Sequence, residues 1–120
     1  MIKSYEELKV WQRSFELCLE IYRTTKRFPK EEQYGLISQL RRAAISIPSN
    51  IAEGKSRGTR KDFCQFLRIA LGSLAELRTQ LRLSKELSYI TIGEYDRIFN
   101  ETDEIGKMLN AMINKLAARS

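Results

Sequence analysis

Residues 59–85 read TRKDFCQFLRIALGSLAELRTQLRLSK, and this stretch decides the fold. Its apolar residues recur at alternating spacings of three and four, which is the period of one helix face. They run for about six turns: Phe63, Leu67, Ala70, Leu74, Leu77 and Leu81. Thr59 precedes the pattern and is a residue type that caps helix N-termini. The stretch therefore predicts a long amphipathic helix that begins after Thr59.

A similar pattern lies toward the N-terminus. Ser4 followed by Glu7 is a capping box and predicts a helix start there, and Phe28-Pro29 predicts its end. The expected buried stripe consists of Leu8, Trp11, Phe15, Cys18 and Tyr22, broadened by Val10, Leu17 and Ile21.

The remaining two helices have equally clear patterns. One is expected from near Lys30, with Glu31 and Glu32 in its first turn and a stripe formed by Leu36, Leu40, Ala44, Ile47 and Ile51. Pro48 lies within that stripe and predicts a kink near residues 44–48. The other begins at a Thr91 and Glu94 capping box, and its stripe is Tyr95, Ile98, Thr102, Ile105, Leu109, Met112 and Leu116.

Four helices with short connections predict an all-α protein, an antiparallel up-down-up-down four-helix bundle, in a single domain of residues 1–120. The first and third helices carry apolar or small residues beyond one stripe: Val10, Leu17, Ile69, Leu71, Gly72, Ala75 and Leu83. A second such face needs a partner, so we expect self-association.

Composition excludes most enzyme classes. The chain has no histidine, which removes histidine-dependent nucleophile pairs and metal sites, and Gly54-Lys55-Ser56-Arg57-Gly58 lacks the spacing and preceding strand of a phosphate loop. We expect no enzyme activity, cofactor or metal. The alternative is a metal site made of carboxylates alone, with Glu16, Glu20, Glu53, Glu76 and Glu104 as its candidate ligands. We favour the interpretation that such carboxylates accept hydrogen bonds from neighbouring side chains instead. Two scattered cysteines, no signal peptide and no membrane-spanning run predict a cytoplasmic location.

Residues 39–54, QLRRAAISIPSNIAEG, place polar side chains beside the proline. A purely structural interpretation is that Ser46 and Asn50 satisfy backbone groups freed by Pro48, while Arg42 pairs with Glu53 or Glu76.

With this segment the chain resembles the small four-helix-bundle proteins associated with intervening sequences of bacterial 23S ribosomal RNA genes. The similarity covers about residues 5–85, and the most specific part is the SIPxNIAEG stretch, residues 46–54. The motif residues that carry it include Gln39, Arg42, Ser46, Pro48, Asn50, Glu53, Gly54, Ser73 and Glu76. The last helix matches only in its apolar period.

The resemblance implies a homopentameric ring of bundles without known catalytic residues. A more distant similarity to the accessory variability protein of diversity-generating retroelements implies a nucleic-acid-binding ring that also contacts a reverse transcriptase. For this chain that role is an analogy of fold.

Charge points to an anionic partner. The net charge is +6 with a pI near 9.5, and residues 91–120 do not share in the basic excess. The turn after residue 54 is our first candidate for phosphate binding, because a new helix N-terminus lies beside clustered cations. Cations along the helix expected after Thr59 could extend this site. The candidates are Lys55, Arg57, Arg60, Lys61, Arg68, Arg78 and Arg82, with Lys85 beside them. We expect RNA or DNA as partner; the alternative is a protein-interaction scaffold whose cations serve solubility or pair with acids.

Overall fold

The computed structural model describes residues 4–118, and within them every regular element is helical. Two short 3₁₀ helices, η1 (Tyr5–Glu7) and η2 (Lys30–Glu32), accompany four α-helices. The α-helices are α1 (Lys9–Thr25), α2 (Leu36–Ser56), α3 (Arg60–Glu86) and α4 (Ile92–Ala118). The all-α prediction is confirmed.

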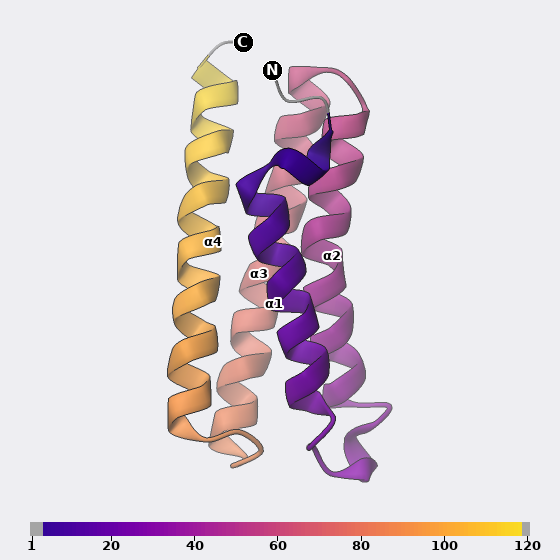
Figure 1. The fold of residues 1–120 in the computed structure, drawn as a ribbon, viewed down its shortest axis with the longest axis vertical. Helices are drawn as coiled ribbons and strands as arrows, with labels where there is room; N and C mark the ends of the chain where they lie inside the picture. The colour runs from indigo at the N-terminus through magenta and orange to yellow at the C-terminus, as the bar shows by residue number, and fades with distance from the viewer. Residues whose placement is uncertain (1–3, 119–120) are drawn as a thin grey trace.

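Consecutive helices run in opposite directions, as Figure 1 shows, and form an elongated bundle of 46 × 22 × 20 Å. Helix α2 packs against α1 and α3, α3 packs against α4, and α4 returns to α1. The start of α3 and the end of α4 consequently lie at the same end of the bundle (Figure 1). This is the end that carries the basic turn between α2 and α3.

The predicted caps are partly correct. Thr59 accepts a hydrogen bond from the Asp62 amide at the start of α3, and Thr91 and Glu94 exchange both bonds of a capping box. Ser4, however, caps η1 by accepting from the Glu6 amide, so α1 begins only at Lys9. A tight 3₁₀ turn separates the Ser4 cap from the α-helix.

The predicted buried stripe of α1 was wrong in its centre. The residues of α1 that face the core each precede a residue of the predicted stripe: Val10, Ser14, Leu17 and Ile21 are buried. Phe15 is 43% exposed, and Trp11, Cys18 and Tyr22 are only partly buried. Aliphatic and small side chains fill the space between packed helices, whereas the aromatic line lies on the flank, where Trp11 and Phe15 stack with centroids 5.1 Å apart.

The predicted start of α2 near Lys30 was also wrong, since the helix begins at Leu36. The Glu32 carboxylate explains the later start, because its Oε1 accepts a hydrogen bond from the Leu36 amide at 3.1 Å. Its Oε2 accepts from the Tyr89 hydroxyl at 2.9 Å, which ties this turn to the segment after α3. A carboxylate that satisfies a free amide stabilises a helix N-terminus.

The core is continuous along all four helices. Its largest fully buried side chains are Val10, Leu17, Ile21, Leu40, Ile47, Ile51, Leu67, Leu77, Leu81, Ile98, Ile105 and Leu109. Pro48 is buried and α2 is assigned as one helix through it, while the predicted kink stays a prediction. Within residues 4–118, no helix has the length and apolarity needed to cross a bilayer.

Candidate nucleic-acid interface

The basic turn is built by local backbone chemistry. Arg57 caps the end of α2, and Gly58 has a φ of 86°, a left-handed conformation that glycine adopts without steric cost. Thr59 then caps α3, so the chain reverses within a few residues. The reversal places the amides of the first α3 turn beside Lys55, Arg57, Arg60 and Lys61, as the sequence predicts for a phosphate site.

Two of the predicted cations near this turn are held by their own helix or its neighbour. Arg57 donates to the Glu53 carboxylate at 2.9 Å, and its guanidinium lies over the Phe66 ring at 5.0 Å. That hydrogen bond is the main reason why the pKa of Arg57 is raised. Lys55 lies with its Nζ 5.8 Å from the centre of the Phe63 ring. Both cations keep their charge near the turn but have less freedom to follow a phosphate.

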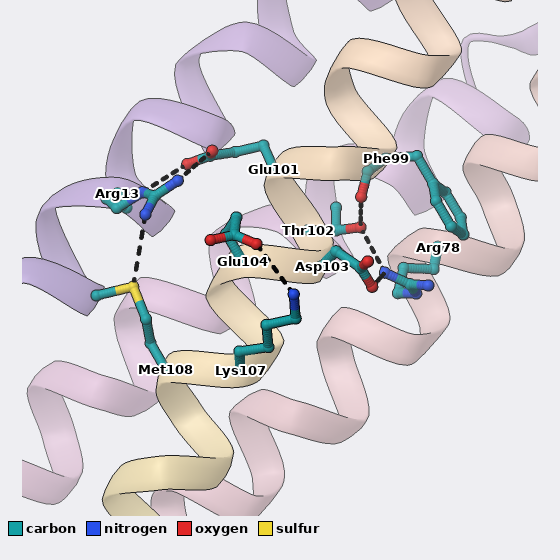
Figure 2. Close-up of polar contacts among 9 residues, drawn as sticks. All are labelled: Arg13, Arg78, Phe99, Glu101, Thr102, Asp103, Glu104, Lys107 and Met108. Atoms are coloured by element: carbon teal, nitrogen blue, oxygen red, sulfur yellow. Dashed lines mark hydrogen bonds and ion pairs between the residues drawn. The ribbon is translucent and has the colours of Figure 1, made fainter.

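Farther along α3, Arg78 is held by contacts with α4, as Figure 2 shows. Its Nη1 donates to the Thr102 hydroxyl at 2.9 Å and to the Asp103 carboxylate at 3.0 Å, both on α4. The guanidinium also covers the Phe99 ring at 3.9 Å. Arg82 pairs with Glu86, one turn along the same helix, at 3.1 Å.

Figure 2 also shows how α1 is fixed to α4 beside this cluster. Arg13 reaches both carboxylate oxygens of Glu101, at 3.0 and 2.6 Å, and donates to the Met108 sulfur. Such a two-point contact orients the helices as well as neutralising charge. Along α4, Lys107 pairs with Glu104. Arg78 and Lys107 are therefore paired with acids and offer less charge to a phosphate.

The first three turns of α3 keep cations without an acidic partner. Within the described residues neither Lys61 nor Arg68 forms an ion pair with an acid. Together with Arg60 they border a pocket of about 620 Å³ between α3 and the end of α4. Cys64, Ile69 and Leu116 form part of its apolar wall.

Three of the motif residues from the family resemblance, Ser46, Gly54 and Ser73, lie where α2 and α3 meet. Ser46 and Ser73 join the two helices through their hydroxyls at 2.8 Å, and Asn50 donates to the Ser46 carbonyl at 2.7 Å and hydroxyl at 2.9 Å. Gly54 is buried where a side chain would meet Phe66. Ser46, Ser73 and Gly54 therefore allow α2 to pack closely on α3.

Part of the structural interpretation of this segment was wrong. Arg42 forms no ion pair with Glu53 or Glu76 among residues 4–118, because Glu53 pairs with Arg57 instead. Asn50 bonds the carbonyl of Ser46, whereas a proline at 48 deprives the carbonyl of Ala44. Arg42 and Glu76 nevertheless border one small cleft of about 210 Å³ with Gln39 and Ser46.

Three of the five carboxylates considered as a metal site form ion pairs. Glu20 pairs with Arg97, Glu53 with Arg57, and Glu104 with Lys107. Over residues 4–118, no three acidic or cysteine side chains gather in a way that could hold a metal ion. Both cysteines are free thiols, and burial raises the pKa of Cys18, which keeps that thiol protonated at neutral pH.

The sequence did not predict the pocket itself or the part that Leu116 plays in it. One signal was present: Lys61, Cys64, Gln65 and Arg68 recur at helical spacing, which places cations and a small apolar residue on one face. The contribution of α4 could not be read from that spacing, because it depends on how the two helix ends meet.

The comparisons with known proteins agree with this architecture. The sequence profile of the 23S rRNA-intervening sequence protein family matches residues 6–111, well beyond the residue 85 to which we expected the similarity to extend. A crystal structure from Bacteroides thetaiotaomicron, of a protein of unknown function from the S23 ribosomal protein family, is 30% identical with a TM-score of 0.80. The alignment covers 88% of this chain and 95% of that one. No curated protein matches. The chain belongs to the 23S rRNA-intervening sequence protein family.

Proposed function

We propose that this chain is a non-enzymatic, self-assembling bundle protein of the cytoplasm that binds RNA or DNA through phosphate contacts at its basic end. The observation that carries the proposal is the pair Lys61 and Arg68, which have no acidic partner within residues 4–118 and border one pocket beside the capped start of α3. When unpaired lysine and arginine side chains neutralise phosphates, the counterions condensed on the nucleic acid are released, and this release drives association.

Self-assembly is supported by the apolar surface that the single bundle leaves uncovered. Large apolar side chains that are exposed and lie away from the pocket include Phe15, Leu19, Leu83 and Leu87. They lie on α1 and α3 and directly after the end of α3. A ring of copies, five by family resemblance, would bury part of this surface and bring several basic ends together, so that weak contacts add by avidity.

A protein-interaction scaffold without nucleic acid is the second candidate. The observation that favours it is the neutralisation of Arg57, Arg78 and Arg82 by acids, which leaves fewer cations for phosphate. The aromatic flank of α1, with Trp11 stacked on a half-exposed Phe15, offers a contact surface for another protein.

A charge-reversal pair separates the two candidates. The double variant Lys61→Glu and Arg68→Glu removes the proposed contacts, and Lys26→Glu with Lys30→Glu makes the same change in net charge at two exposed residues outside the candidate site. With labelled single-stranded RNA at low salt, we expect the first variant to bind about tenfold or more weakly, since two phosphate contacts are lost, and the second to bind within about threefold of the parent. Equal affinities of the two variants, or no binding by the parent, would favour the scaffold.

Self-assembly has a separate readout. Sedimentation of the parent chain is expected to give a species several times the 14.0 kDa of one copy. A mass of one copy at high protein concentration would contradict this part of the proposal.

A further inference from the structure

The pocket at the basic end combines two surfaces that a phosphate alone does not need. Its border carries Arg60, Lys61 and Arg68, whereas its wall includes Cys64, Ile69 and Leu116. Its volume of about 620 Å³ lies in the range of small-molecule sites, which are about 300–1,000 Å³. Ile69 remains 46% exposed, so this wall has apolar area that a ligand could cover.

We propose that this pocket holds one unstacked nucleotide of a single strand, with its base against the apolar wall and its neighbouring phosphates on Lys61 and Arg68. The inference rests on the proposed phosphate-binding function and specifies its ligand as single-stranded nucleic acid.

The spacing of the cations supports this arrangement. Lys61 and Arg68 are seven residues apart, which is about two turns and about 10 Å along α3. Cys64 lies between them on the same helix face and contributes to the pocket wall. Phosphates on the two sides of one nucleotide therefore meet separate cations, while the base between them meets the wall.

The chemistry of the wall distinguishes single strands from duplexes. The bases of a duplex are stacked and paired, so that a protein contacting its backbone finds only phosphate and sugar in reach of such a pocket. A single strand can turn a base outward, and proteins bind such bases on apolar surfaces and on the planes of arginine side chains. Arg68 and the partly exposed Ile69 line the same pocket.

A binding experiment with matched ligands tests the inference. The probes are a fluorescein-labelled oligothymidylate of about twelve nucleotides, a strand of the same length made of abasic sites, and a blunt duplex of that length. In fluorescence anisotropy at low salt, we expect the abasic strand to bind about tenfold more weakly than oligothymidylate, because loss of one base contact has an effect of that order.

Two isoleucine variants locate the effect. Ile69→Gln makes the pocket wall polar without changing charge, and Ile45→Gln makes the same change at a comparably exposed residue, 42% against 46%, that does not line the pocket. We expect Ile69→Gln to weaken oligothymidylate binding about tenfold and leave the abasic strand unaffected, while Ile45→Gln changes neither.

The outcomes separate the two proposals. Equal binding of abasic and base-bearing strands, tighter binding of the duplex than of oligothymidylate, or equal effects of the two isoleucine variants would overturn the nucleotide pocket and leave phosphate binding in place. Absence of binding to all three probes at low salt would overturn the proposed function itself.

Discussion

Substitution of Gly54 by alanine tests the packing that brings α2 and α3 together at the basic end. A Cβ at residue 54 would lie 2.6 Å from the Cβ of Phe66 and 3.2 Å from the Phe63 ring. The Phe66 Cβ is fixed to the backbone of α3, so a change of side-chain rotamer cannot relieve the contact. The helices would have to separate by about 1 Å to restore an ordinary carbon–carbon distance.

Two effects of opposite sign determine how much Gly54→Ala changes the free energy of unfolding. Overpacking in a helix interface costs about 1–3 kcal/mol, whereas replacing glycine by alanine within a helix stabilises it by up to about 1 kcal/mol. We expect Gly54→Ala to lower the free energy of unfolding by about 1–2 kcal/mol. Gly72→Ala is the matched control, because a Cβ there meets nothing within 4 Å, and we expect it to raise stability by about 0.5–1 kcal/mol.

Urea unfolding followed by circular dichroism measures both variants at one protein concentration. Denaturation slopes of about 1–3 kcal/mol per molar urea convert the expected difference into urea midpoints about 1 M apart. A Gly54→Ala protein as stable as the parent, or no more affected than Gly72→Ala, would refute the close contact between α2 and α3.

Three further predictions follow from local contacts. Thr59→Ala removes the side-chain oxygen that accepts from the Asp62 amide, so we expect thermal unfolding to show a free energy of unfolding lower by about 1 kcal/mol. Thr59→Ser keeps a hydroxyl and should retain most of the parent stability, so equal losses in the two variants would contradict the cap. The hydrogen bond from Arg27 is the main reason why the pKa of Glu94 is lowered from 4.5. The pair between these residues therefore stabilises the folded protein above pH 4.5, and this stabilisation is lost as the pH falls through the lowered pKa of Glu94. Urea midpoints at pH 7 and pH 3 should therefore differ more for the parent than for Glu94→Gln, and equal differences would argue against this ion pair. Phe15→Ser should change the free energy of unfolding by less than about 1 kcal/mol, as expected for a side chain 43% exposed, and a loss typical of a core phenylalanine would show that it is buried.

The sequence predicts the number and type of the helices well, because apolar residues at period 3.6 specify them directly. It does not choose between the two lines of α1, since Val10, Leu17 and Ile21 satisfy the same period as Trp11, Phe15 and Cys18. The choice depends on the width of the space between packed helices, which is a property of the whole bundle.

The candidate site, too, could be predicted from the sequence only in part. The cations of the basic turn could be identified from their clustering after Gly54. Their pairing could not be read from the sequence, because the partners of Arg78 lie on α4, at Thr102 and Asp103, which only the fold brings near. The pocket likewise requires Leu116, which is distant in sequence from Lys61.

The salt dependence of binding to a single strand tests phosphate recognition by Lys61 and Arg68 most directly. The logarithm of the association constant should fall linearly with the logarithm of salt concentration, at a slope of about −0.7 for each phosphate contacted. We expect Lys61→Glu with Arg68→Glu to make the slope shallower by about 1.4, since two contacts are lost, and Lys26→Glu with Lys30→Glu to leave it unchanged. Parallel slopes for the parent and both variants, or a flat slope for the parent, would contradict it.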